Sequence, residues 1–489
     1  MSQLALTNIV TVSVSTSSPG VGSYNTSNLA LFTDDAPASG WSGASLGYAA
    51  YLTPTQVGLD FGTTSKTYAM ANAVFSQQPN ILTGGGQLII ILLKVGVQTL
   101  TLSGVAASGA FTISYGGNTT TSLPYTSTAA QIQTALELLT GLAQWQVTGS
   151  IASESLVITA YGTYGALGSI TFPSNTLQTA GSVAITITQV ATVTGETIGA
   201  AITRTAGLVQ YFGILVNESV GTSQVIPSAD VTAAAAIVLP LNKIAFFVTN
   251  SVTDLTATTG MIALLTSAAY SNTRMLYYGD TTTGGVGVQN ALVMSASYAS
   301  LGLSVNFNGS LTTTTMHLKV LAGVSPDPSM TQTILNEAVA CGADTYVSLQ
   351  GVSAVFCSGA NSFYDQVYNQ QWFVGALQVA GFNYLAQTGT KVPQTEAGMT
   401  GLKSAYRAVC EQGVTNGYLA GGSWNSATTF GNPAQLISNV SQRGYYIYSS
   451  PVALQAQTAR AARQAPLVQI AAKQACAIQS STVIVNINP

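Results

Sequence analysis

One group of residues in this sequence matches a pattern used for nucleophilic catalysis. Gly43, Ser45 and Gly47 fit G-x-S-x-G, in which a serine is exposed on a tight turn between a strand and a helix. Such a serine needs a histidine base within hydrogen-bond reach, and His317 is the only histidine in the chain. The residues before Gly43 are rich in glycine, serine and proline and indicate a loop. A serine hydrolase using Ser45 and His317 is therefore an alternative that the surrounding sequence disfavours.

Other catalytic or cofactor chemistry has little support. One imidazole cannot build a histidine-based zinc site, and the cysteines are far apart, with no CxxC pair. We expect them to be buried free thiols. The stretch from Gly62 to Lys66 lacks the order of residues that a phosphate-binding loop requires. We expect His317 to lie in a strand over residues 314–320. The sequence thus predicts no enzyme, no catalytic residue, no cofactor and no metal.

The composition points to a protein that packs against copies of itself. Charged residues make up 6% of the 489 residues and hydrophobic residues 47%, whereas about 25% of residues are charged in a typical soluble domain. The net charge of −3 gives no basic surface for nucleic acid. The apolar run from Leu88 to Leu93 is cut by Lys94 and is too short to span a membrane. A neutral, hydroxyl-rich surface suits subunits of an assembly, although a secreted β-rich protein would look similar.

The order of predicted elements indicates a mixed α/β, multidomain α+β protein whose sheets are covered by helices. In residues 198–325, Ile244 to Val248 has the composition of a buried strand, and Asp254 is placed to cap a helix through Met261. Residues 95–197 differ, because they alternate like strands around one helix that Ser127 would cap. We interpret that stretch as a β-rich ββαβββ domain inserted into the surface of the α/β domain.

Both ends of the chain have the composition of β strands. Residues 6–15 alternate valine with threonine or serine, and residues 481–489 show a similar alternation. Chain ends are usually frayed unless something ties them down, so each end either closes the protein's own sheet or adds to another molecule's sheet. Their presence at both termini favours strand exchange between subunits. The residues expected to exchange are Ile9, Val10, Val12, Val14, Val483, Ile484, Val485 and Ile487.

The region before the last strand is expected to hold one strand and two helical segments. Tyr445 to Tyr448 is an aromatic and β-branched run. Residues 451–479 are rich in alanine and glutamine and are divided by Pro466, which lacks an amide hydrogen and cannot continue a helix from before it. The apolar positions that predict the second helix are Leu467, Ile470, Ala471, Ala475 and Ile478.

Stretches at both ends of the chain resemble a known family. They are RGYYIY at 443–448, RAAR followed by AP within 460–466, and AIQSSTVIVNIN at 477–488. Their order resembles the C-terminal end of the contractile-tail sheath proteins of bacteriophages. LTNIVTVSVS at 6–15 resembles the opening of one phage subfamily of those sheaths. The resemblance covers the two ends and the order of elements in about the last third of the chain.

The resemblance implies a structural subunit that polymerises helically around a tail tube and contracts to drive the tube through the host envelope. Implied partners are further copies of the chain, the tail tube protein, and baseplate and tail terminator proteins, without direct nucleic-acid binding or membrane insertion. The protein would be assembled in the host cytoplasm and reside in the virion. Arg460, Arg463 and Lys473 would face the tube; otherwise they belong to an ordinary solvated face.

The expected division has five parts. They are an N-terminal β arm at 1–23, a central α/β domain at 24–94 plus 198–325, the inserted domain at 95–197, a C-terminal sheath domain at 326–480 and a C-terminal β arm at 481–489. A non-contractile tail protein or a capsid-associated structural protein is the alternative within the structural class. Such a protein would share the composition but would not need β arms at both ends.

Overall fold

The computed structural model describes residues 25–483 except residues 39, 44–45, 141–144, 162–169, 193–195, 218–227, 257 and 283–289. The chain forms two compact units. The larger unit comprises Asn25–Asn306 and Thr314–Tyr368. The smaller unit contains Phe307–Thr313 and the described residues from Asn369 onward, so the division falls inside helix α9 (Tyr364–Gln387). Residues 1–23 and 484–489, which hold most of the predicted arms, lie outside the described residues.

The larger unit is built on one mixed sheet. Neighbouring strands from β3 through β1, β12, β13 and β14 to β15 run parallel, while β2 and β16 are antiparallel edge strands. In order across the sheet, the strands are β16 (Val352–Phe356), β15 (Ala343–Leu349), β14 (Thr273–Tyr277), β13 (Ile244–Thr249), β12 (Gly213–Asn217), β1 (Leu29–Thr33), β3 (Leu88–Leu92) and β2 (Tyr48–Tyr51). β1, β3, β12 and β13 are buried along their whole length, as continuous apolar strands covered on both faces should be.

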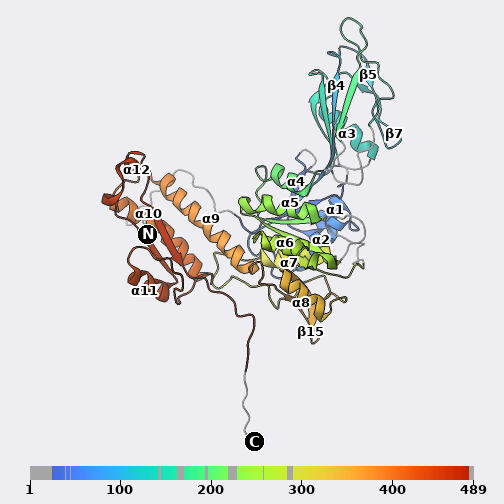
Figure 1. Cartoon of the computed structure of the whole chain (residues 1–489). Helices are drawn as coiled ribbons and strands as arrows, with labels where there is room; N and C mark the ends of the chain where they lie inside the picture. The colour runs from blue at the N-terminus through green and yellow to red at the C-terminus, as the bar shows by residue number, and fades with distance from the viewer. Residues whose placement is uncertain are drawn as a thin grey trace, which may run out of the picture. The chain divides into compact units, whose positions relative to one another are not determined.

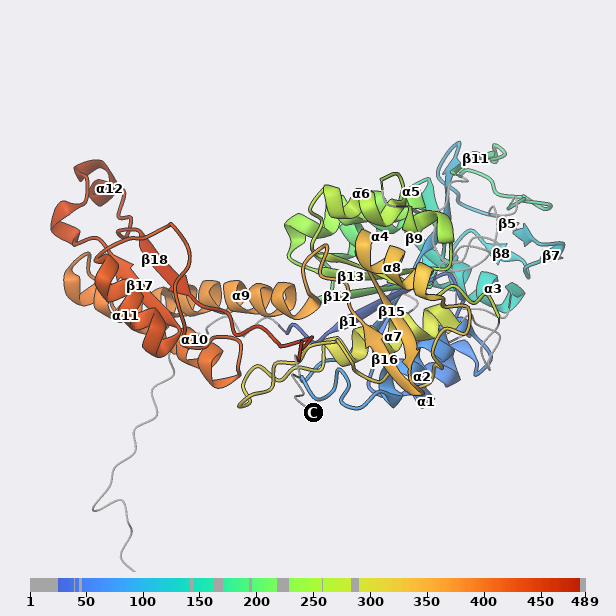
Figure 2. The same ribbon diagram turned by 60° about the horizontal axis from the view of Figure 1, so that its bottom comes forward.

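Helices cover both faces of this sheet (Figure 2). α7 packs on β12 and β13 and against α2, while α5 packs on β13 from the other side, with α4 and α6 beside it. The helices and helical turns of this unit are α1 (Pro54–Phe61), α2 (Lys66–Ser76), α4 (Ile198–Thr205), α5 (Ser228–Val238), η2 (Leu239–Leu241), η3 (Val252–Leu255), α6 (Met261–Ser267), α7 (Asn290–Gly302) and α8 (Gln332–Cys341). The predicted mixed α/β fold, with a sheet covered by helices, is confirmed.

One predicted helix cap in this unit is wrong. Asp254 lies inside η3, where its Oδ2 accepts a hydrogen bond from Thr249 Oγ1 at 2.6 Å. The residue at the N-terminus of α6 is Gly260. Asp254 fixes the end of β13 instead, because the threonine with which it bonds is the last residue of that strand.

A second sheet lies in the residues around β4 and α3 (Figure 1). It has its own apolar core. Its strands are β11 (Ile187–Thr192), β4 (Lys94–Leu102), β10 (Ser155–Tyr161) and β9 (Trp145–Ser150), all antiparallel. α3 (Ala129–Thr140) packs on β9, and the short strands are β5 (Ala110–Phe111), β6 (Ser114–Tyr115), β7 (Asn118–Thr119) and β8 (Leu123–Pro124). The predicted cap Ser127 is wrong: Thr128 Oγ1 accepts from the Gln131 N–H at 3.2 Å, and Gln131 Oε1 accepts from the Thr128 N–H at 2.9 Å.

The chain enters the second sheet at Lys94 and leaves it before Glu196, and hydrogen bonds join these two residues. The Glu196 N–H donates to the Lys94 carbonyl at 2.8 Å, and the Lys94 N–H donates to Glu196 Oε2 at 3.1 Å. Arg204 clamps the same carboxylate through Nε and Nη2, both at 2.7 Å, and Nη2 also reaches the Leu92 carbonyl at 3.1 Å. A bidentate guanidinium–carboxylate pair that is mostly buried fixes this point of departure.

The smaller unit contains a two-stranded sheet and several helices. Its elements, beyond its part of α9, are α10 (Glu396–Thr415), α11 (Pro433–Arg443), β17 (Tyr445–Ser449), η4 (Val452–Leu454), α12 (Gln457–Ala461) and β18 (Val468–Ala472). All four cysteines are thiols outside any disulfide, as predicted. Cys341, Cys357 and Cys410 are buried, but Cys476 is exposed, so the prediction of burial is wrong for that residue.

Candidate assembly site in the smaller unit

The helix predicted for residues 467–478 is wrong, because part of this stretch is a strand. Residues Val468–Ala472 form strand β18, which pairs antiparallel with β17. Short apolar runs fit the helical and the strand period alike, and Val468 and Ile470 also alternate with Gln469. Pairing with β17 decides between the two, because it gives the backbone of β18 its hydrogen bonds. The preceding segment is helical only over the short turn η4 and over α12.

Local signals place β17 directly after a helix. Asn432 caps α11, accepting hydrogen bonds from the Ala434 and Gln435 N–H groups at 3.0 and 3.2 Å. Gly444 ends α11 with φ 84°, and its N–H donates to the Val440 carbonyl at 3.0 Å. This left-handed conformation suits glycine and turns the chain into β17. Leu436 and Val440 of α11 pack on Ala471 of β18.

Among the described residues, the outer edges of the two-stranded sheet have no strand neighbour. The Lys473 N–H donates to the Gly444 carbonyl at 2.7 Å, one position beyond the paired residues. Because bonded and non-bonded positions alternate along an antiparallel pair, Ile447 and Ile470 form a non-bonded pair whose N–H and C=O groups point away from the partner strand. Within the described residues, β17 and β18 have only each other as strand neighbours. Both edges can therefore accept a further strand.

A separate stretch of chain is anchored beside α10. The Phe307 carbonyl accepts hydrogen bonds from Gln412 Nε2 at 2.8 Å and Asn416 Nδ2 at 3.2 Å. The Phe307 ring stacks on Trp372, with 4.5 Å between ring centroids and an interplanar angle of 3°. The Leu311 N–H donates to the Thr415 carbonyl at 2.9 Å. These contacts make residues 307–313 part of the smaller unit rather than a loose connection.

Most residues predicted for strand exchange cannot be placed. Val483 is described; it lies outside any strand, and 77% of it is exposed. The other predicted residues, Ile9, Val10, Val12, Val14, Ile484, Val485 and Ile487, lie outside the described residues. In the described part of the chain, β17 and β18 are strands whose outer edges have no strand neighbour. The alternation of Val468, Gln469 and Ile470 is the sequence signal that could have revealed β18.

The three predicted tube-facing cations lie on two segments. Arg460 belongs to α12, and Arg463 follows it with φ 57°, its N–H donating to the Arg460 carbonyl at 3.0 Å. Both side chains are exposed. Lys473 is half-buried just after β18, and its Nζ donates to the Gln474 carbonyl at 3.3 Å. Contact with a tube stays a prediction for all three residues.

His317 is held as a structural residue. The predicted strand over residues 314–320 is absent from this described stretch, and His317 lies in a turn. Its Nδ1 accepts a hydrogen bond from the Cys357 N–H at 3.1 Å, and its ring packs edge-on against Phe356. Burial lowers the pKa of His317. Ser45 lies outside the described residues, so the pairing of these two side chains stays untested.

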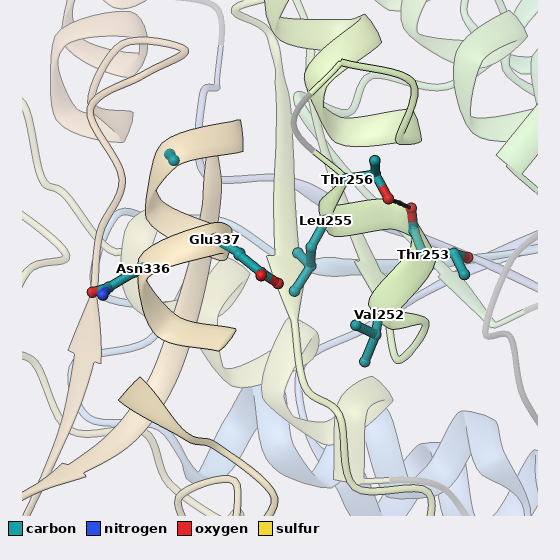
Figure 3. Close-up of a pocket in the computed structure, with 7 residues that line it drawn as sticks. Val252, Thr253, Leu255, Thr256, Asn336 and Glu337 are labelled. Atoms are coloured by element: carbon teal, nitrogen blue, oxygen red, sulfur yellow. Dashed lines mark hydrogen bonds between the residues drawn. The ribbon is translucent and has the colours of Figure 1, made fainter. Parts of the chain in front are cut away.

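A cavity of about 530 Å³ lies between η3 and α8. Figure 3 shows the side chains that line it. Val252 and Leu255 line one side, and Asn336 and Glu337 of α8 line the other. Of the described residues that line the cavity, Glu337 is the one with a titratable side chain. In the described ranges, no three His, Cys, Asp or Glu residues are arranged to hold a metal ion. Among the described helices, none is long and apolar enough for a membrane span.

Comparison with known proteins links the smaller unit to one family. Residues 364–487 match the family model described as E217 tail sheath protein gp31-like, C-terminal domain. The match includes α9, α10, α11 and the β17–β18 sheet. Among curated proteins, no match to this chain is found. The resemblance of the C-terminal stretches is confirmed: residues 364–487 belong to the C-terminal domain family of phage tail sheath proteins, which are structural proteins.

Proposed function

We propose that this protein polymerises helically around a tail tube and contracts, driving the tube through the host envelope. The observation that supports this most directly is the β17–β18 sheet, whose outer edges have no strand neighbour among the described residues. The sequence supplies β-type segments at 1–23 and 481–489. Such a segment can add to an open edge of another subunit through backbone hydrogen bonds.

The physical behaviour of such an assembly follows from the type of contact. An arm of one subunit on the sheet of another is a heterologous contact, and a heterologous contact that does not close a ring produces an open helix. Arms held by backbone bonds keep neighbours linked while the folded bodies repack. Contraction then needs two packings of the same subunits, with the extended packing kinetically trapped. A free-energy difference of a few kcal/mol per subunit between the two packings, summed over many copies, would drive the tube forward.

The proposed polymer would have further protein partners and would belong to the virion. The tail tube would contact Arg460, Arg463 and Lys473, and baseplate and tail terminator proteins would cap the ends of the polymer. The protein would be assembled in the host cytoplasm and reside in the virion. Residues 95–197, with their separate core and tied ends, would form an inserted surface domain. The two arms of the five-part division are likewise proposals; its C-terminal domain at 326–480 would have to give up residues 326–368, because β15 and β16 belong to the large sheet of the larger unit.

High-resolution electron microscopy of the assembled polymer tests the proposal. We expect β17 and β18 to gain flanking strands that trace to residues 1–23 and 481–489 of other subunits. We also expect two polymer lengths at equal subunit number, one long and one short. A β17–β18 sheet that stays two-stranded in the polymer would contradict strand exchange. A single fixed length under every condition would instead favour the non-contractile structural protein.

A further inference from the structure

The smaller unit contains two Asn-Gly dipeptides, Asn308-Gly309 and Asn416-Gly417. Asparagine is a thermolabile residue, because the backbone nitrogen of the next residue can attack its side-chain amide. Glycine favours this attack, since it has no Cβ to block the approach to its nitrogen. The sequence gives the two asparagines the same neighbour, so their surroundings in the fold decide which of them reacts.

Asn416 is held so that its side chain cannot turn toward the next backbone nitrogen. It is 0% exposed. Its Nδ2 donates to the Phe307 carbonyl at 3.2 Å, and its Oδ1 accepts from the Tyr418 N–H at 3.1 Å. The Gly417 N–H, on the nitrogen that would attack, donates to the Val414 carbonyl at 3.2 Å. Attack at Asn416 would therefore break three hydrogen bonds in a site closed to water.

Asn308 lies in different surroundings. It belongs to a turn, and its side chain is exposed to solvent. Gly309 is half-buried, and within the described residues its N–H makes no backbone hydrogen bond. Water reaches the amide of Asn308, and the attacking nitrogen of Gly309 gives up no backbone hydrogen bond when it moves.

We propose that Asn308 is a site of spontaneous deamidation in the folded protein and that the fold protects Asn416. In this reaction the Gly309 nitrogen bonds to Cγ of Asn308, and the bond from Cγ to the amide nitrogen breaks. The proton of the attacking nitrogen leaves with the amide group as ammonia, and a cyclic succinimide is formed. Water then opens the ring at either carbonyl, so the product is aspartate or isoaspartate at position 308.

An isoaspartate would lengthen the backbone between two anchored positions. On one side of Asn308, the ring of Phe307 is 6% exposed and stacks on Trp372. On the other side, the Leu311 N–H donates to the Thr415 carbonyl at 2.9 Å. In isoaspartate the main chain runs through the side chain, which adds a methylene between these anchors. We expect the added length to strain both contacts, so that aged protein unfolds at a lower denaturant concentration than fresh protein.

Peptide mapping by mass spectrometry tests the site in full-length protein kept in mildly alkaline buffer. Trypsin places Asn308 on the peptide 275–319 and Asn416 on the peptide 408–443. We expect the mass gain from replacing an amide by a carboxyl to grow with time at Asn308 and to be absent at Asn416. In guanidinium chloride, where the fold is lost, both should react at similar rates. Asn308→Gln, whose side chain would have to form a larger ring, should stay unmodified.

Two results in the folded protein would overturn the proposal. Asn308 would stay intact although it reacts in guanidinium chloride, or Asn416 would react as fast as Asn308.

Denaturant unfolding tests the effect on stability. Aged wild type should lose stability relative to fresh protein, and aged Asn308→Gln should not. Asn308→Asp carries the new charge without the longer backbone and should unfold like fresh wild type. If Asn308→Asp loses as much stability as the aged protein, the charge causes the loss, and the proposed strain on the anchors is wrong.

Discussion

Ile447 of β17 and Ile470 of β18 lie opposite each other at a position where the two strands share no backbone hydrogen bond. The N–H and C=O groups of both residues therefore point to the outer edges of the sheet. These edges are where an arm from another subunit would add. In the proposed polymer, the outward groups of Ile447 and Ile470 would therefore bond to strands of other subunits.

Blocking one edge should stop assembly without unfolding the subunit. Ile470→Pro removes an outward N–H and leaves the bonds between β17 and β18 in place, as proline is tolerated at strand edges. We expect a folded monomer that no longer forms polymer, measured by sedimentation and circular dichroism.

The matched control is proline one position earlier. The N–H of Gln469 points toward Tyr448, so Gln469→Pro removes a bond inside the pair and should destabilise the smaller unit, by roughly 3 kcal/mol. Normal polymers of Ile470→Pro would show that this edge receives no strand.

The stacked pair of Phe307 and Trp372 should be a main support of the smaller unit. Phe307 is 6% exposed, so Phe307→Ala leaves a cavity beside Trp372. We expect a loss of about 3–4 kcal/mol in the free energy of unfolding. Denaturant unfolding followed by tryptophan fluorescence measures it.

Phe382, on the same helix as Trp372, provides the control. It is 53% exposed, and Phe382→Ala should change the stability of the monomer by less than about 0.5 kcal/mol. Equal losses in the two variants would mean that residues 307–313 are not anchored as described.

Because of Lys243, the free energy of unfolding should rise as the pH increases from about 8 to 10.5. It is 4% exposed, its Nζ lies 3.7 Å from the centroid of the Tyr211 ring, and burial lowers its pKa from 10.5 to about 8. The folded-state pKa lies below the unfolded one, so between pH 8 and 10.5 the unfolded chain binds more protons and stability rises with pH. Below pH 8 the penalty for burying the charge is present in full.

Comparison with Lys243→Met isolates this contribution. Between pH 7.5 and 9.5, the free energy of unfolding should rise by about 2 kcal/mol more in the wild type than in the variant. Urea titrations at each pH measure the difference. Parallel pH curves for the two proteins would contradict an unfavourable buried ammonium at this position.

Arg460 of α12 and Arg463, which follows that helix, should strengthen attachment to a tail tube. Exposed charge pairs contribute up to about 1 kcal/mol each, so Arg460→Gln and Arg463→Gln should each weaken co-assembly with purified tube by up to about five-fold. The loss should shrink as salt is added. Lys319→Gln, an exposed cation of the larger unit, is the control and should have no effect. If the weakening of co-assembly did not depend on salt, the two arginines would act through packing rather than through their charge.

Elements with strong local signals could be predicted from sequence. The buried strand at Ile244 and the strand at Tyr445 were predicted from continuous apolar or aromatic runs, and both are confirmed. Thr395, of a residue type that favours helix N-termini, accepts a hydrogen bond through Oγ1 from the Gly398 N–H at the start of α10. In each case the deciding interactions lie within a few residues of the chain.

Features that depend on distant partners could not be predicted in this way. β18 is a strand because β17 lies beside it, and nothing within residues 467–478 requires that pairing. At the ends of β1 and β12, Thr33 accepts a hydrogen bond from Asn217, which lies 184 residues away in the sequence. Asp35 alone looks like part of a polar loop, and only the parallel pairing of β1 with β12 brings Asn217 to it.

The measurement that tests the central claim most directly is electron microscopy of the full-length protein beside a variant that ends at Gln479. Strand exchange predicts tubes or rings from the full-length protein and folded, unassembled subunits from the shortened one. If both proteins assemble equally well, residues 480–489 do not link the subunits, and the proposed connection between the C-terminal arm and the open edges of β17 and β18 is wrong.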